Sequence, residues 1–429
     1  SVGAVTLPIP ANIPTGPADP VSASPGEFSQ PVVKVGMKAQ QRIGVNLNGV
    51  NDYGSTHEFV DLVMQSRGFG PATAPWDTSR SVQLDPNTGW PLEDFGMVVF
   101  VEQQNVAGLG GTYTIKFKGP ETTSLALIAG TPGTITSKSY DAAKGEVTIA
   151  LAFPEKGANM FLSFTGTQGK LKDLRIIRPG YNVDNPPTFT TPFLDHISRF
   201  SVLRFMDWMT TNEHDVATTW ATRPTPITKR TANQHGMAPG MSWERAIELA
   251  NVSASDMWIN IPLNADANYI RELARLIKKS LAPNLKVYVE YSNEVWNPSF
   301  VQLTRTRDAA LAALAATPRT TRIKFDGNNN EWYLAFRYFT EKSMEMSDIF
   351  RSEFPSDMMT RIRPVLAWQA SGVGSAVDML AFPSAAYGKM AGEYFYGYAG
   401  APYFNMGDKQ STEGLTVDQV VTALAGQVK

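Results

Sequence analysis

The sequence predicts an α/β protein built on a TIM-type (β/α)8 barrel that is incomplete, with six strands identifiable and a β-sandwich inserted. Apolar runs of strand length alternate with segments of helical periodicity in residues 39–96 and 179–429. Between them, residues 97–178 contain strand-like runs with turn signals. A further run that begins at Leu285 ends abruptly in Asn293-Glu294, and the carboxyl ends of barrel strands are where such folds place reactive side chains.

The composition is that of a globular protein and excludes several classes of function. The 429 residues are 43% hydrophobic and 18% charged, which allows a large core. A formal net charge of −2 gives no basic footprint for nucleic acid, and no apolar run is long enough to cross a bilayer. Cysteine is absent and the four histidines lack metal-ligand spacing, so we expect neither a metal nor another cofactor.

The first 38 residues are rich in proline and are expected to form an extended arm with little regular structure. The chain starts at Ser1 without a methionine, as a secreted protein does after its leader is removed. A longer chain cut at this point would look the same. We expect an extracellular protein, chiefly because of the substrate inferred below.

Six segments are predicted to be barrel strands, and most are separated by predicted helices. The fourth strand leads into Glu294, and the other five are Arg42–Asn48, Ser201–Trp208, Met257–Pro262, Ile362–Gln369 and Tyr394–Phe404. The predicted helices are Thr56–Gln65, Trp243–Asn251, Asn268–Ser280, Trp332–Glu353 and Val417–Val428.

Residues 97–178 are predicted to form the inserted all-β sandwich, because short strands follow one another with turns between them. The glycine-rich stretch Gly108–Gly111 is not a dinucleotide fingerprint, since Tyr113 stands where the third glycine is required. A hairpin turn fits it better. The sandwich could bind a glycan or serve as a structural support. Its predicted strands are Met97–Val101, Thr112–Phe117, Ser124–Ile128, Gly133–Ser137, Glu146–Phe153, Met160–Thr165 and Leu171–Ile177.

The segment Tyr291–Asn297, with the sequence Tyr-Ser-Asn-Glu-Val-Trp-Asn, closely resembles the acid/base strand of retaining glycoside hydrolases of clan GH-A. Those enzymes are (β/α)8 barrels in which Asn-Glu ends the fourth strand. The resemblance extends in pattern over roughly residues 40–410. It implies that Glu294 is the proton donor and that Asn293 holds a ring hydroxyl of the sugar. The alternative is a Glu that only caps a loop.

The resemblance implies further site residues on other strands. An arginine in the second strand, Arg204, would orient the nucleophile and keep it ionised, or it pairs inside the barrel with Glu290. Tyr403, at the end of the sixth strand, would donate a hydrogen bond to the nucleophile, or it is a core aromatic residue. Candidate substrate-binding residues are Trp208, Trp296 and Trp368 for stacking and Asn48, Asn260 and Gln369 for hydroxyl groups, with Asn46, Asp207 and Asn264 as weaker candidates. The alternative is that each tryptophan packs in the core or at its rim and that each polar residue satisfies backbone groups in a loop.

The six strands leave the nucleophile unassigned, because the resemblance implies that a Glu at the end of a seventh strand fills this role. We expect a second polypeptide, or a further carboxyl-terminal segment, to complete the barrel. Glu393 is the competing candidate, but it precedes its strand and would face the opposite end of the barrel. The sequence thus predicts a glycoside hydrolase that cleaves β-linked poly- or oligosaccharide with retention. The alternative is a non-catalytic carbohydrate-binding or structural protein on a degenerate barrel.

Overall fold

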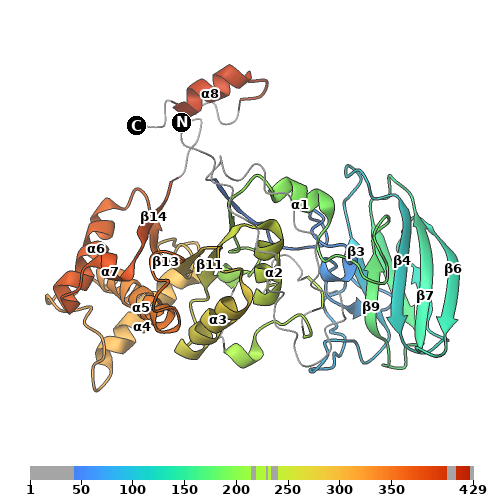
Figure 1. Cartoon of the computed structure of the whole chain (residues 1–429), viewed down its shortest axis with the longest axis horizontal. Coiled ribbons are helices and arrows are strands. Elements are labelled where there is room, and N and C mark those ends of the chain that lie inside the picture. The colour runs from blue at the N-terminus through green and yellow to red at the C-terminus, as the bar shows by residue number, and fades with distance from the viewer. Residues whose placement is uncertain (1–42, 214–218, 229, 233–239, 403–411, 426–429) are drawn as a thin grey trace. The chain divides into compact units, whose positions relative to one another are not determined.

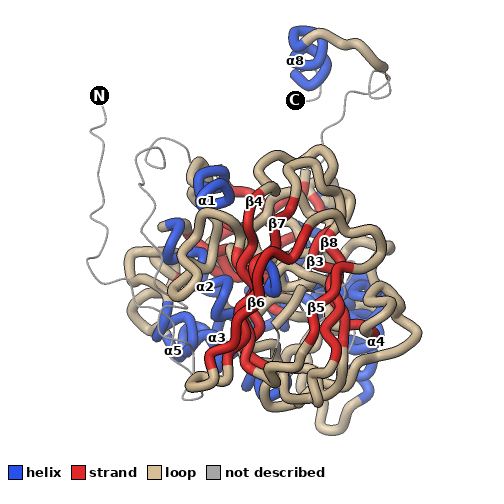
Figure 2. The backbone as a smooth tube through the Cα atoms, turned by 90° about the vertical axis from the view of Figure 1, so that its right-hand side faces the viewer, coloured by secondary structure: helices blue, strands red, loops and turns tan. Residues whose placement is uncertain are grey.

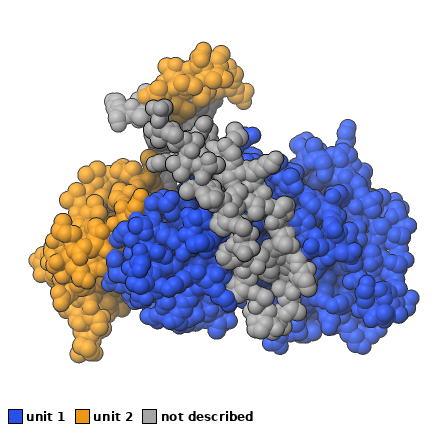
Figure 3. Space-filling view, viewed as in Figure 1, with its two compact units in different colours: residues 1–293, 345–364 blue, residues 294–344, 365–429 orange. Residues whose placement is uncertain are grey.

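The computed structural model of the chain describes residues 43–213, 219–228, 230–232, 240–402 and 412–425. The proline-rich arm over residues 1–38 and the candidate Tyr403 lie outside the described residues. The chain divides into two compact units, each made of two segments (Figure 3). Unit 1 comprises residues 1–293 and 345–364, and unit 2 comprises residues 294–344 and 365–429.

A six-stranded sheet carries the barrel-like part of the chain, and every predicted barrel strand is found in it. Its strands follow one another in chain order, and they pair in parallel between β1 and β12 and again between β13 and β14. Parallel strands in chain order with intervening helices are the signature of βα repeats. The strands are β1 (Gly44–Asn46), β10 (Val202–Arg204), β11 (Asp256–Ile261), β12 (Val287–Tyr291), β13 (Ile362–Gln369) and β14 (Gly397–Ala401).

Helices separate most of these strands, and two of the helices begin at residues that are typical of helix N-caps. Ser242 accepts a hydrogen bond from the backbone N–H of Arg245 at the start of α2, and Asp266 does the same for Tyr269 at the start of α3. Four predicted helices are confirmed within about three residues, whereas α1, α4, α6 and the short α7 were not predicted. The helices are α1 (Thr191–Ile197), α2 (Trp243–Ser253), α3 (Ala267–Ser280), α4 (Val301–Ala315), α5 (Glu331–Glu353), α6 (Val373–Tyr387), α7 (Ala391–Tyr394) and α8 (Val417–Ala425), with short 3-10 turns η1 (Leu62–Met64), η2 (Thr211–Glu213) and η3 (Trp220–Thr222).

The predicted helix over Thr56–Gln65 is wrong. The segment is largely extended and contains only the single turn η1. The backbone N–H of Val60 donates to Thr188 O (3.0 Å), and the Asp61 carboxylate accepts from the backbone N–H of Ile176 (2.9 Å). Backbone pairing with residues more than a hundred positions away thus overrides a local helical pattern.

Two four-stranded antiparallel sheets account for the predicted all-β segment, with orders β2-β3-β8-β5 and β6-β7-β4-β9 (Figure 2). Their inner faces share one core, because Phe100 contacts Phe153 (ring centroids 5.4 Å) and Phe117 contacts Phe164 (5.9 Å) across the two sheets. All seven predicted strands are found, and β2 adds an eighth that the sequence did not reveal. The strands are β2 (Gly70–Pro71), β3 (Phe95–Phe100), β4 (Gly111–Lys118), β5 (Ser124–Leu127), β6 (Thr134–Asp141), β7 (Glu146–Phe153), β8 (Met160–Thr165) and β9 (Lys172–Ile177).

The glycine-rich stretch before β4 is a loop and not the expected hairpin turn, because β3 and β4 lie in different sheets. It binds a side chain of the same protein. The backbone N–H groups of Gly108 and Gly110 donate to the Glu155 carboxylate, and these bonds lower its pKa. Among the described residues, no helix is both long and apolar enough to traverse a membrane.

Candidate functional site

A cross-strand row of polar and aromatic side chains runs over the sheet of unit 1. The register places Asn46 beside Arg204, Arg204 beside Trp258, and Trp258 beside Tyr288. Residues in register on parallel strands project from the same face. The Trp258 and Tyr288 rings stack at 5.5 Å, and the Arg204 guanidinium lies 5.8 Å from the centre of the Trp258 ring. Strands β1, β10, β11 and β12 therefore present one continuous polar and aromatic row (β11 is labelled in Figure 1).

Arg204, at the end of β10, is the centre of the hydrogen-bond network. Its Nη2 donates to Glu290 Oε2 (2.8 Å) and to Asn293 Oδ1 (2.9 Å), and its Nη1 donates to Asn46 Oδ1 (3.3 Å). These contacts use three of the five N–H donors of the guanidinium. The predicted pairing of Arg204 with Glu290 is thus present in the structure.

Glu290 is buried and its carboxylate is bonded within this network. Its side chain is 3% exposed, and Trp258 Nε1 donates to the same Oε2 atom that accepts from Arg204 (2.7 Å). A buried carboxylate is stable only when its charge is paired and hydrogen-bonded, as it is in this case. Glu290 therefore fixes Arg204 rather than facing solvent.

A strained turn follows β12 and leads to Glu294. Ser292 has a φ of 58° and Glu294 a φ of 41°, in the left-handed region that costs L-residues about 1–2 kcal/mol each. The end of β12 is tied to β11, since the Ser292 N–H donates to Ile261 O (2.8 Å) and Asn260 Nδ2 donates to Ser292 O (2.8 Å). Strain of this kind persists only where surrounding bonds enforce it, and such positions cluster at functional sites.

Glu294 itself is half-buried and is the first residue of unit 2. Asn297 Nδ2 donates to Glu294 Oε2 (2.8 Å), and the Asn297 backbone N–H donates to Glu294 O (2.8 Å). The carboxyl group is thus oriented by Asn297, three residues later in the chain. Its preceding residue, Asn293, is buried and also donates from Nδ2 to Asn212 Oδ1 (3.1 Å).

A second titratable side chain lies near Arg204. Burial raises the pKa of Asp207, and the positive charge of Arg204 opposes that rise. Asp207 is half-buried in the loop that follows β10. The sequence suggested it only as a weak candidate for binding a hydroxyl group, and its electrostatic coupling to Arg204 was not predicted.

Two of the three candidate stacking tryptophans lie in the core. Trp208 is 1% exposed and packs against Phe205 (ring centroids 5.6 Å) and Phe59 (6.0 Å). Trp368 is 2% exposed, packs against Phe336 (4.7 Å) and donates from Nε1 to Ser375 Oγ (2.9 Å). Neither ring has a face available to a sugar, so a stacking role is wrong for Trp208 and Trp368, and both follow the alternative of core packing.

The remaining candidate site residues differ in their exposure and in the contacts that they make. Asn260 is buried, and its amide N–H is bonded to the backbone of Ser292. Glu393 lies in α7, ahead of β14 as expected, and accepts from the Met390 N–H (2.8 Å). Asn46 and Asn48 are exposed, and Trp296, Asn264 and Gln369 are half-buried.

Sequence reasoning missed Trp258, Tyr288 and Asn212 as members of this site, and it named Asn297 only as part of the motif Tyr291–Asn297. A signal for Trp258 was present, because Asp256, Trp258 and Asn260 alternate with fully buried apolar residues along β11. In the part of the chain that the structure describes, no group of three or more His, Asp or Glu is placed to hold a metal ion.

Comparison with known proteins gives limited similarity. No protein-family model matches the chain, and no curated protein matches it. Among solved structures, the CBM22-1–GH10 modules of a Clostridium thermocellum endo-1,4-β-D-xylanase in complex with xylohexaose match with a TM-score of 0.33 and 13% identity, over 88% of this chain and 79% of that chain. An arabinose-bound GH51 α-L-arabinofuranosidase matches with a TM-score of 0.28 and 11% identity, over 83% and 74%. At such TM-scores, neither likeness carries an argument about this chain.

Proposed function

We propose that the chain is a glycoside hydrolase that cleaves β-linked poly- or oligosaccharide with retention, and that Glu294 is its general acid/base. The observation that carries the proposal is the Asn293-Glu294 pair directly after β12. The half-buried Glu294 follows an amide that Arg204 holds. The resemblance of Tyr291–Asn297 to the acid/base strand of clan GH-A supports the same role. A polysaccharide substrate is met outside the cell, where we propose that the protein acts.

In the proposed reaction, the protonated Glu294 gives its proton to the glycosidic oxygen as the bond from that oxygen to the anomeric carbon breaks. The resulting carboxylate then accepts a proton from the water that attacks the anomeric carbon in the second step. Asn297 orients the carboxyl group through its bond to Oε2. The Asn293 amide, fixed by Arg204 and Asn212, has a second N–H that can donate to a sugar hydroxyl.

Retention requires a second carboxyl group about 5–5.5 Å from the first, which forms the covalent intermediate. Glu290 is unsuited to this role because it is buried and its Oε2 accepts from both Arg204 and Trp258. We propose that a Glu on a seventh strand is the nucleophile and that the unused donors of Arg204 keep it ionised.

Replacing Glu294 with Gln, in the chain together with the segment that supplies the seventh strand, tests the assignment. We expect hydrolysis of a natural β-glycan, whose leaving group needs a proton, to fall by about 10²–10⁴-fold. The first step with an aryl β-glycoside that has a good leaving group should fall much less, because that leaving group departs without protonation. Glu393→Gln, which removes an exposed carboxyl in α7, is the control and should leave both rates unchanged. Wild-type turnover in Glu294→Gln would remove the assignment.

Azide tests the retaining mechanism with the variant Glu294→Ala. Azide can attack the anomeric carbon of the covalent intermediate without base assistance, displacing the nucleophilic carboxylate. The expected product from a β-aryl glycoside is a β-glycosyl azide, identified by proton NMR, together with an increase in turnover. An α-glycosyl azide would show inversion and overturn retention.

A non-catalytic carbohydrate-binding protein is the second candidate. The carboxylate that Arg204 binds is Glu290, and its bonds to Arg204 and Trp258 make it unsuited to act as a nucleophile. Calorimetric titration with β-linked oligosaccharides and a reducing-end assay separate the two functions. Binding with release of reducing ends supports the enzyme. Binding without release over many hours supports the second candidate.

A further inference from the structure

Asn260 stands out as a buried polar side chain whose donor is used and whose acceptor is not. It lies near the end of β11, is 1% exposed, and donates from Nδ2 to Ser292 O (2.8 Å). Its Oδ1 has no hydrogen-bond partner within the described parts of the chain. Buried polar atoms are nearly always paired, so burying Oδ1 without a partner is costly. This cost indicates that the bond donated by Nδ2 has a role.

The bond from Asn260 is accepted by the carbonyl of Ser292, in the turn that leads to Glu294. Ser292 is fully buried and has a φ of 58°, and Glu294 two residues later has a φ of 41°. Asn293 lies between these two residues, and the peptide planes on either side of it set the direction of its side chain. The bond from Asn260 fixes the plane that carries the Ser292 carbonyl, which is the peptide that enters Asn293.

We infer that Asn260 is a positioning residue for the acid/base. It holds the turn after β12 so that Asn293 meets Arg204 and Glu294 is presented to the substrate. This inference rests on the proposed function. It replaces direct binding of a sugar hydroxyl as the role of Asn260, because the side chain is buried and its bond is to backbone.

The chain offers a matched control for this interaction. Asn251 in α2 is also buried, at 4% exposed, and its Nδ2 donates to Ser280 O at the same distance of 2.8 Å. Its bond joins the end of α2 to the end of α3 and involves none of the residues of the proposed site. Asn→Asp at either position replaces a donor by an acceptor that faces a carbonyl, so both variants lose the same kind of bond.

The experiment compares Asn260→Asp and Asn251→Asp in the chain together with the segment that supplies the seventh strand, at a temperature where circular dichroism shows both to be folded. For Asn260→Asp we expect kcat on a natural β-glycan to fall by about 10²-fold, since a displacement of about 1 Å has this effect on a reacting group. The loss on an aryl β-glycoside with a good leaving group should be several-fold smaller, with KM unchanged within about twofold. Asn251→Asp should change neither substrate's kcat by more than about twofold.

Two further outcomes keep the inference open to refutation. If Asn260→Asp does not fold, Asn260→Ala removes the donor without adding a charge and should show the same dependence on the leaving group. Equal losses on both substrates, or equal losses in the Asn260 and Asn251 variants, would reduce Asn260 to a structural residue. Wild-type activity in Glu294→Gln would remove the proposed function and the inference together, whereas impaired Glu294→Gln with leaving-group-independent Asn260 variants removes the inference alone.

Discussion

At the scale of single residues, His57 shows how burial fixes a protonation state. Arg178 Nη2 donates to His57 Nδ1 (2.8 Å), and the Nε2–H donates to Gln103 Oε1 (3.1 Å), which assigns the neutral tautomer. Burial is the largest effect and the charge of Arg178 the next, and together they lower the pKa of His57 to about 3. The neighbouring Glu58 changes in the opposite direction, because burial raises its pKa.

The lowered pKa of His57 predicts that this residue makes the folded protein less stable in mild acid. In the unfolded chain His57 binds a proton near pH 6.5, while in the folded chain it stays neutral down to about pH 3. Between these values the unfolded state binds more protons at His57, so the contribution of His57 to the free energy of unfolding should fall as the pH drops, by at most about 1.4 kcal/mol per pH unit. Urea denaturation at pH 7 and pH 5 should show this slope in wild type and in His196→Gln, an exposed control, but a reduced slope in His57→Gln. Identical slopes in all three proteins would contradict it.

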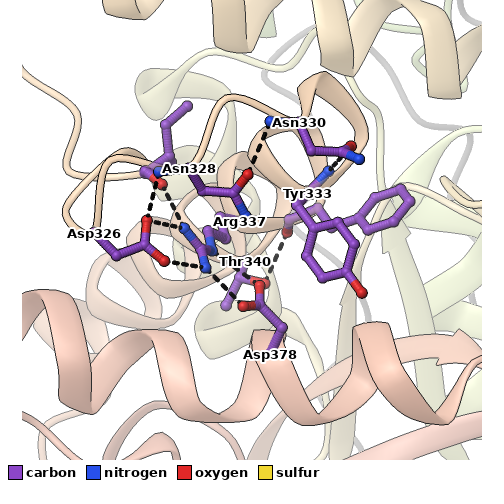
Figure 4. A network of polar contacts seen from close by, with 9 residues as sticks. Asp326, Asn328, Asn330, Tyr333, Arg337, Thr340 and Asp378 are labelled. Carbon is purple, nitrogen blue, oxygen red and sulfur yellow. Dashed lines mark hydrogen bonds and ion pairs between the residues drawn. The ribbon is translucent and has the colours of Figure 1, made fainter.

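At the scale of secondary structure, Arg337 joins three segments of unit 2 (Figure 4). From α5 it forms paired bonds with Asp326 (2.9 and 2.9 Å) and with Asp378 in α6 (2.9 and 2.7 Å), and it donates to Ile323 O (3.1 Å). Planar guanidinium geometry allows two bidentate pairs, which an ammonium group cannot reproduce. Asp378 and Arg337 thereby fasten α6 to α5.

Arg337→Met should lower the free energy of unfolding by about 3 kcal/mol, because it leaves two carboxylates facing a space that held their cation. The double variant Arg337→Met with Asp378→Asn should recover part of this loss, since one of the two charges is removed. Chemical denaturation of the four proteins in a double-mutant cycle measures the coupling. A coupling near zero would show that the Arg337–Asp378 pair contributes little.

Most strands could be predicted from the sequence, because their apolar runs and turn residues are local. The bounds of β13, β7 and β8 agree with the prediction to the residue. Helix α6 was missed because Pro383 interrupts it and apolar residues such as Val377 face solvent as well as the core, which hides the one-sided periodicity. The extended segment before η1 depends on distant backbone partners and has no local signal.

The candidate site was predictable in part for the same reason. Adjacent residues such as Asn293 and Glu294 are placed by one strand end, and the Arg204–Glu290 pair follows from strand alternation. Whether a strand-end side chain faces solvent or core depends on the layer packed over it. Trp208 is buried against aromatic rings, and Asn260 donates to a backbone carbonyl at the end of the neighbouring strand β12. Neither contact can be predicted from the local sequence.

At the scale of the whole molecule, the chain passes between its two units three times, twice inside a regular element. Helix α5 contributes residues to unit 2 up to Met344 and to unit 1 from Glu345, and β13 divides in the same way at Pro364. A helix or strand forms cooperatively, so one part loses its bonds when the other unfolds. The two units should therefore unfold together.

Coupled unfolding can be measured by hydrogen exchange. Arg337→Met alters unit 2, and we expect it to accelerate exchange of the amides of β12 in unit 1 by the same factor as those of α6 in unit 2, under conditions where exchange reports global opening. Asp184→Asn, which changes one exposed ion pair with Lys116, is the control and should leave both rates near wild type. Faster exchange confined to α6 would show that unit 2 opens alone.

The row of side chains over β10, β11 and β12 also provides the protein with an optical reporter. The Trp258 indole is stacked on Tyr288 and hydrogen-bonded to Glu290, and the guanidinium of Arg204 lies above its ring. Indole fluorescence responds to the charges and hydrogen bonds around the ring. A ligand that rearranges this network changes the emission of Trp258, and the spectrum of Trp258→Phe supplies the background from the other tryptophans. Occupancy can thus be followed by light in a protein whose turnover is slow or abolished.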